Sequence, residues 1–344
     1  MTVGAALAML GVIPTLLVLY RPLRADSGRH AVGITVTCAG VSAALWAAVS
    51  AALPGVIGSP MWLPTVAFAA VAGVLVALPL RTDPTSGRAI VVFCAVWTAV
   101  IFIPVVTVVV FPAAVGLDPA ASPLDLGGVL PVHVTVGASA LAVALFRRRR
   151  LVQLGERAST TAVILAAVAL WALYALALVS LELAFDDVTP VILTNVVAAP
   201  LAAVVAWLAV ERARRHRNTL GGAVAGLVCG LVAVSAGSGF LEPLWAILTG
   251  VIAGLVPASI LLHDPHRARL TLVVLHLVPA ALGLVLLGLF GTGSGFIYTG
   301  QPTAAIAQLS ATVVVALWSL AVSAALLVVA RLLARTRRTG RSII

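Results

Sequence analysis

The sequence predicts an all-α polytopic membrane protein with eleven transmembrane helices, its N-terminus outside the cell and its C-terminus in the cytoplasm. Of the 344 residues, 62% are hydrophobic and only 9% are charged, and the mean hydropathy is +1.18. This composition cannot supply the polar surface of a water-soluble protein. Apolar runs of about 20 residues, the length that crosses the hydrocarbon of a bilayer, recur along the chain. Arginines fall in every second loop and set the orientation.

Eleven segments have the length and composition of a spanning helix. They comprise residues 3–20, 31–53, 62–80, 89–111, 124–146, 160–184, 188–210, 220–235, 241–262, 270–290 and 303–333. The eighth is short and rich in glycine, which permits close contact between helices. We therefore expect a single transmembrane domain over residues 1–334, followed by a short Arg-rich cytoplasmic tail over residues 335–344.

Loop charge tests the number of spans, because Arg and Lys gather in short cytoplasmic loops. Every loop that follows an odd-numbered span contains arginine, and no loop that follows an even-numbered span does. An error of one span would destroy this alternation. It places the protein in the cell membrane with the N-terminus outside. It also explains the net charge of +10 without nucleic-acid binding, since all the basic residues lie where the topology requires them.

Cysteine and polar residues give no sign of a metal site, a cofactor or an enzyme. Cys38, Cys94 and Cys229 lie far apart in three different spans, a pattern typical of neither a disulfide framework nor a zinc site. The spans also lack a serine, histidine and carboxylate set for nucleophilic catalysis, and a second buried carboxylate for acid-base work. We expect neither a bound cofactor nor catalysis.

Two of the six histidines lie inside predicted spans, His133 in the fifth and His276 in the tenth. An ionisable group in hydrocarbon costs roughly 2 to 3 kcal/mol on insertion scales and indicates a substrate, ion or proton path. Matching positions in the fifth and tenth spans suggest a five-helix unit, an inverted copy of it and one final helix. Inverted repeats place their site at the midplane between the halves. The alternative is that each histidine merely bonds a carbonyl of a neighbouring helix.

Several motifs, in order, resemble the ammonium transporters and their Rhesus relatives over nearly the whole chain. Asp125 precedes His133 by eight residues in the sequence DLGGVLPVH, as an Asp precedes the first pore histidine in that family. His276, followed by Gly288-Leu289-Phe290, is similar to the second pore histidine. Further similar stretches are Asn195 to Trp207 with Glu211, Asn218 to Val228, and Gln308 to Ser319.

The resemblance implies a homotrimer with one narrow, mostly apolar pore in each subunit and ammonium or ammonia as substrate. His133 and His276 would face each other in the pore, and Asp125 would support the structure and bias the local potential. Phe68 and Phe111 would be vestibule or gate aromatics. A regulatory protein could bind on the cytoplasmic side. Independently of the family, Asp125 can act as a structural cap at the outer end of its span.

Some residues depart from the family pattern in ways that would narrow the pore. Leu193 stands where the family has an inner gating Phe, and Leu277 and Val278 replace small residues after the second histidine. Two further functions therefore stay open. One is a non-conducting relative that senses ammonium or regulates a partner, and the other is a channel for another small neutral molecule.

Overall fold

The computed structural model describes residues 1–21, 29–80, 87–146, 158–263 and 269–339. Within these ranges, nine helices are long and apolar enough to cross a membrane, and two shorter apolar helices lie at Leu130–Phe146 and Leu220–Ser235. Together the eleven segments coincide, in order, with the eleven predicted spans. The all-helical polytopic fold is therefore confirmed.

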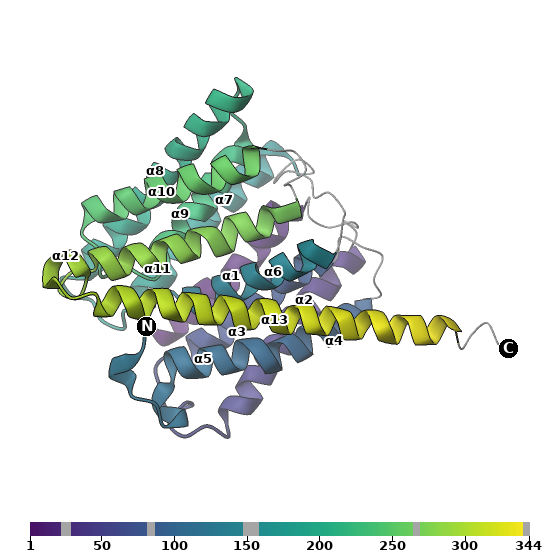
Figure 1. Cartoon of the computed structure of the whole chain (residues 1–344). Coiled ribbons are helices and arrows are strands. Elements are labelled where there is room, and N and C mark those ends of the chain that lie inside the picture. The colour runs from purple at the N-terminus through teal and green to yellow at the C-terminus, as the bar shows by residue number, and fades with distance from the viewer. Residues whose placement is uncertain (22–28, 81–86, 147–157, 264–268, 340–344) are drawn as a thin grey trace.

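Helices account for most of the residues that the structure describes (Figure 1). Their bounds are α1 Thr2–Leu19, α2 Arg29–Ser50, α3 Trp62–Leu80, α4 Gly87–Trp97, α5 Ile103–Val110, α6 Thr135–Phe146, α7 Thr160–Leu181, α8 Thr189–Arg215, α9 Leu220–Ser235, α10 Pro243–Leu262, α11 Val278–Phe290, α12 Phe296–Thr299 and α13 Thr303–Thr339. Two 3-10 turns, η3 Pro112–Val115 and η4 Pro119–Ala121, lie between α5 and α6.

In the described part of the chain, three π-helical turns interrupt the spans, and each has a proline inside it or two residues after its end. They are η2 Thr98–Phe102 between α4 and α5, η5 Leu130–Val134 before α6, and η7 Val273–Leu277 before α11. The prolines are Pro104, Pro131 and Pro279. Proline has no N–H and its ring clashes with the preceding turn, so a wider turn relieves the helix at these points.

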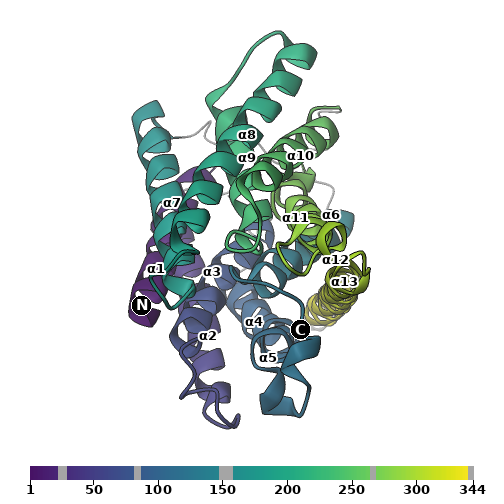
Figure 2. The same ribbon diagram turned by 90° about the vertical axis from the view of Figure 1, so that its left-hand side faces the viewer.

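Burial differs greatly between the spans. In α3, 89% of the most apolar stretch is buried inside the protein, whereas in α13 the share is 22%. Figure 2 shows α3 within the bundle and α13 at one edge, seen almost end-on. A polar contact holds α13 to the bundle, because Ser323 Oγ donates to Ser139 Oγ on α6 at 2.8 Å. Trp97 Nε1 on α4 donates to the same oxygen at 2.8 Å.

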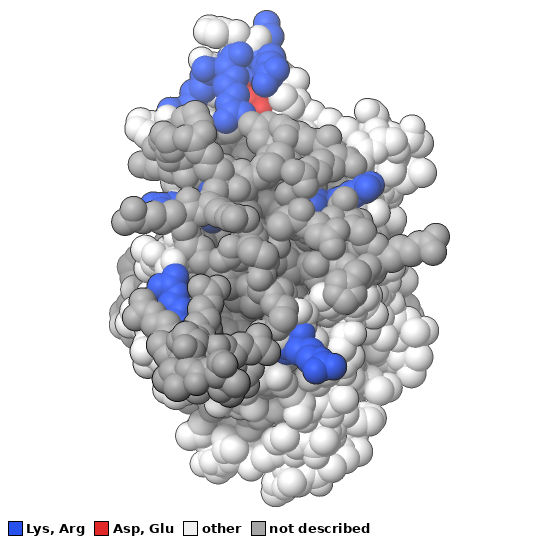
Figure 3. All heavy atoms as spheres, turned by 90° about the vertical axis from the view of Figure 1, so that its right-hand side faces the viewer, with Lys and Arg blue, Asp and Glu red and all other residues white. Residues whose placement is uncertain are grey.

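The two chain ends leave the bundle on opposite sides, as an odd number of crossings requires (Figure 1). Basic side chains lie on the face from which the C-terminal end projects (Figure 3). The described acidic residues Asp118, Glu182 and Glu242 lie next to helix ends of the opposite side. Acidic residues are not confined to that side, because Glu211 directly precedes Arg212 near the end of α8. Which end faces the cytoplasm stays a prediction.

The division into a membrane domain and a tail also stays a prediction. Helix α13 continues to Thr339 without a break, so the expected boundary between residues 334 and 335 falls inside a helix. Residues 340–344 lie outside the described part of the chain.

Candidate functional site

Equivalent turns in the two halves of the chain carry the two intramembrane histidines. His133 is the fourth residue of η5 and His276 is the fourth residue of η7, and each turn leads directly into a spanning helix. Both side chains are almost completely buried, with 3% and 1% of their surface exposed. The local structure thus repeats between the fifth and tenth spans, as the inverted-repeat interpretation requires.

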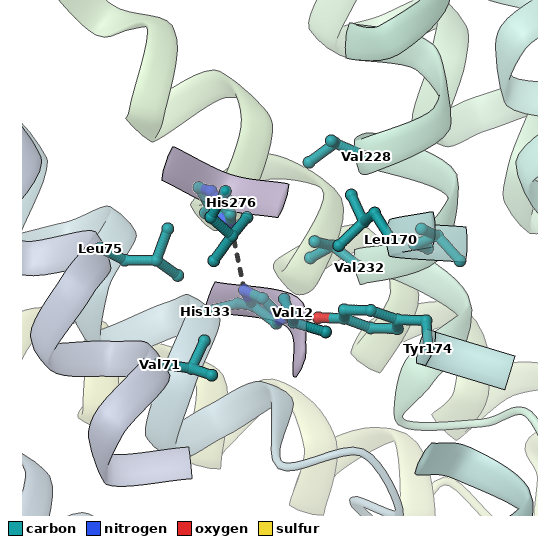
Figure 4. Close-up of a pocket in the computed structure, with 11 residues that line it drawn as sticks. Val12, Val71, Leu75, His133, Leu170, Tyr174, Val228, Val232 and His276 are labelled. Carbon is teal, nitrogen blue, oxygen red and sulfur yellow. Dashed lines mark hydrogen bonds between the residues drawn. The ribbon is translucent and has the colours of Figure 1, made fainter. Parts of the chain in front are cut away.

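The two imidazoles face each other (Figure 4). The Nδ1 atoms of His133 and His276 are 3.0 Å apart, within hydrogen-bond distance. The ring centroids are 5.1 Å apart and the ring planes differ by 9°. The alternative in which each histidine bonds only a helix carbonyl is therefore wrong, since each has the other as its partner.

The hydroxyls of two tyrosines are hydrogen-bonded to the remaining ring nitrogens of the pair. The Tyr174 hydroxyl lies 2.8 Å from His133 Nε2, and the Tyr20 hydroxyl lies 2.9 Å from His276 Nε2. Tyr174 is on α7, the first helix of the second half, and Tyr20 caps α1, the first helix of the first half. Each half therefore supplies a tyrosine to the histidine of the other half.

The number of protons on the two imidazoles fixes the donor and acceptor roles along this series of four hydrogen-bonded side chains. A neutral imidazole has one N–H donor and one acceptor nitrogen, and burial in apolar surroundings disfavours the charged form. In the Nδ1 to Nδ1 bond, one histidine must donate and the other must accept. The three hydrogen bonds therefore point the same way, so that one tyrosine donates to its histidine and the other accepts.

A small cavity adjoins the histidines. Its volume is about 20 Å³, enough for about one water-sized molecule. Apart from His133, His276 and Tyr174, the lining is aliphatic, from Val12 and Leu16 on α1, Val71 and Leu75 on α3, Leu170 on α7, and Val228, Leu231 and Val232 on α9. A molecule in this cavity can form hydrogen bonds only with the histidine and tyrosine groups.

Comparison with known sequences agrees with this geometry. The sequence model described as the Ammonium Transporter Family matches residues 26–339. The chain belongs to the ammonium transporter family. Among relatives, an "Ammonium transporter" of Bacillus subtilis is 28% identical over 218 residues, covering 60% of this chain and 52% of the relative. An "Ammonium transporter" of Aquifex aeolicus is 26% identical over 248 residues, covering 70% of this chain and 58% of the relative.

This family member thus spans somewhat over half the length of those relatives. Solved structures show the same fold. Mep2 of Candida albicans superposes with a TM-score of 0.80 at 20% identity, covering 95% of this chain and 83% of that one. A structure described as "Sensor Amt Protein" has a TM-score of 0.78 at 16% identity, covering 96% of this chain and 92% of that one.

In this ammonium transporter family member, Asp125 lies in the loop before η5 and acts as a cap. Its Oδ1 accepts the N–H of Val129 at 2.7 Å, and its Oδ2 accepts the N–H of Leu130 at 2.8 Å. Asp125 is not among the residues that line the cavity. This geometry is that of a structural cap, in which the carboxylate accepts hydrogen bonds from backbone N–H groups at the start of the turn that carries His133.

We expect Asp125→Asn to lower stability, because the amide keeps one acceptor and turns an NH₂ group toward a backbone N–H. Leaving a partly buried donor unpaired costs about 1 to 3 kcal/mol. The midpoint of thermal unfolding in detergent measures the loss. Asp118→Asn is the matched control, since Asp118 accepts the Ala120 N–H at 2.9 Å in an exposed loop and should change stability by less than about 0.5 kcal/mol. Equal midpoints for the two variants would contradict the capping role.

The other predicted site residues lie away from the cavity. Phe68 is buried against Gly128, whose positive φ of 66° and close approach to the ring both favour glycine. Phe111 is buried against Trp46, with ring centroids 5.8 Å apart. Neither aromatic ring lines the cavity, so their gate or vestibule roles stay predictions.

The three residues expected to narrow the pore do not line the cavity either. Leu193 is 46% exposed on α8, and its role as an inner pore residue stays a prediction. Leu277 and Val278 are partly exposed, and the backbone and Cβ of Leu277 pack against Gly137 of α6. Their narrowing of the pore beside His276 stays a prediction.

Sequence reasoning missed the functional placement of Tyr20 and Tyr174. A signal for both was present, because the chain has only three tyrosines. These two lie in the first and sixth spans, which correspond to each other under the same inverted repeat that pairs the fifth and tenth. The third tyrosine, Tyr298, lies in the short helix α12 at the surface.

Proposed function

We propose that this chain is an ammonium transporter that moves ammonia, taken from ammonium, through a narrow apolar pore past His133 and His276. The observation that carries the proposal is the buried histidine pair, with its Nδ1 atoms 3.0 Å apart, beside a cavity that fits one water-sized molecule. Membership of the ammonium transporter family supports ammonium as the source of the transported molecule.

The chemistry of the cavity favours a neutral molecule over an ion. Aliphatic side chains form most of its wall, and moving an unpaired ion from water into such surroundings costs far more free energy than moving a neutral amine. Ammonia is close to water in size, and it can both donate and accept hydrogen bonds. The histidine nitrogens are the groups that can replace the partners it loses on leaving water.

Flux in proteoliposomes tests this function. Liposomes that contain the purified protein should respond to an ammonium gradient with a change of internal pH, recorded by a trapped dye, that exceeds the change in protein-free liposomes. A current on a supported membrane, recorded with the same protein, shows whether net charge accompanies the ammonia. No response above that of protein-free liposomes, with folded protein verified in the membrane, would refute transport.

An ammonium sensor is the second candidate, and one observation favours it. All four ring nitrogens of the histidine pair have partners within 3.0 Å, so a passing molecule finds no vacant ring nitrogen. A protein that binds ammonium without flux in the same liposomes would support the sensor. A cytoplasmic partner would then receive the signal.

Assembly and orientation belong to the same proposal. We infer a homotrimer with the N-terminus outside, the C-terminus in the cytoplasm and a regulatory protein as a partner on the cytoplasmic face. Extensive exposed apolar surface on α7 and α8, including Leu165, Leu176 and Val205, supports contacts with lipid or neighbouring subunits. Native mass spectrometry tests the stoichiometry, with an expected mass three times the 35.0 kDa of the chain.

A further inference from the structure

The two tyrosines that complete the hydrogen-bonded chain are not equivalent toward the cavity. Tyr174 lines the cavity together with both histidines, whereas Tyr20 is not among the lining residues. In Figure 4 the Tyr174 hydroxyl oxygen is directed at the His133 ring at the edge of the cavity. A molecule in the cavity therefore meets the bond between Tyr174 and His133.

There is no room for a guest within this bond. The Tyr174 oxygen and His133 Nε2 are 2.8 Å apart, the distance of one direct hydrogen bond. A molecule that bonded to both atoms would have to separate them by about twice that distance. Any guest that uses His133 Nε2 must therefore displace the hydroxyl first.

We propose that the Tyr174 hydroxyl is a specificity-determining latch, which competes with the transported molecule for Nε2 of His133. This inference rests on the proposed function, since it concerns how a guest gains access to the histidine pair. No covalent bond changes in the exchange. The hydrogen bond between Tyr174 and His133 breaks, and a hydrogen bond between the guest and His133 replaces it.

The latch selects guests by their hydrogen-bonding capacity. A small apolar molecule cannot compensate the lost bond, so the closed arrangement stays favoured against it. An ammonium ion has donors but no acceptor, and it would also carry its charge into an aliphatic cavity. A neutral, water-sized molecule with both a donor and an acceptor can form a hydrogen bond with His133 Nε2 whether that nitrogen donates or accepts. Ammonia meets these requirements.

The test is Tyr174→Phe, which removes the hydroxyl and keeps the ring. Without the competitor, we expect the KM for ammonium-driven flux to fall about 2- to 10-fold, the range that corresponds to one net hydrogen bond. Tyr298→Phe is the matched control, since the Tyr298 hydroxyl accepts an exposed hydrogen bond from Trp245 Nε1 and lies outside the cavity. Its KM should equal that of the parent.

A second measurement does not depend on transport. In ¹⁵N-histidine-labelled protein in bilayers, Tyr174→Phe should shift the His133 Nε2 resonance, and ammonium chloride at fixed pH should perturb that resonance at about 2- to 10-fold lower concentration than in the parent. Equal half-saturation concentrations, or an Nε2 resonance that the substitution does not move, would overturn the latch.

The two measurements separate failure of the latch from failure of transport. Flux in the parent with an unchanged KM in Tyr174→Phe overturns the latch and leaves the transporter standing. Silence of both proteins in the flux assay, with the expected order of half-saturation concentrations by NMR, overturns transport and retains the latch in an ammonium-binding sensor. Silence in both assays overturns both.

Discussion

His133→Ala is expected to reduce ammonium-driven flux about 5- to 100-fold. In the parent, His133 and His276 provide most of the polar atoms in an otherwise aliphatic cavity. Without the His133 ring, an ammonia molecule loses two of the four ring nitrogens that can pair with it, and a buried polar group left unpaired costs about 1 to 3 kcal/mol. The substitution also leaves Nδ1 of His276 and the Tyr174 hydroxyl without the partners they have now.

His276→Ala should produce a loss of similar size, because it removes the other member of the same pair. Internal pH change in proteoliposomes measures the flux of both variants. His263→Ala is the matched control, since His263 lies at the end of α10, exposed, with its Nδ1 3.3 Å from an Arg214 nitrogen. That variant should keep the parent rate. Parent-like flux in both pore variants would remove the histidines from the proposed pathway.

Gly137→Ala is expected to disturb both the fold and the site. An added Cβ on Gly137 would lie 2.5 Å from the backbone nitrogen of Leu277 and 2.8 Å from its Cα. These are backbone atoms of η7, the turn that holds His276, so the helix or the turn must move. Overpacking of this kind costs about 1 to 3 kcal/mol. Displacement of η7 would lengthen the 3.0 Å contact between the histidines and reduce flux by up to about 10-fold, the worth of one hydrogen bond.

Gly40→Ala provides the comparison for Gly137→Ala. Gly40 lies in α2, and an added Cβ there would meet no atom within 4 Å. Because alanine favours a helix over glycine, this variant should gain about 0.5 to 1 kcal/mol. Thermal unfolding in detergent and flux in liposomes measure both variants. A Gly137→Ala protein with parental stability and flux would show that α6 and η7 tolerate a wider separation.

The sequence sufficed for the spans and for the histidine pair, for definite physical reasons. Spanning helices need long apolar segments, and the eleven segments found by that criterion coincide with the described helices. An intramembrane histidine is costly enough to indicate a site. Two of them in corresponding spans therefore indicated a shared position, which the contact between His133 and His276 confirms.

The faces of individual helices were harder to predict. A π turn inserts an extra residue, which rotates the following side chains by about 100° around the helix axis. One such turn ends at Leu277, so that this residue faces Gly137 and not the cavity. Leu193 shows how sharply the environment changes along one helix, since its neighbour Ile192 is fully buried while Leu193 is exposed. An alignment error of one residue is therefore enough to exchange a buried position for an exposed one.

The length of α13 has a mechanical consequence. Its 37 residues form one uninterrupted helix of about 55 Å, whereas the hydrocarbon of a bilayer is about 30 Å thick. A substantial part of this rod must therefore stand outside the hydrocarbon. Within the bundle, the rod is fastened through Ser323 to Ser139 of α6, the helix that continues from the turn holding His133. A force applied at the projecting end would therefore act on α6, the helix that follows the turn holding His133.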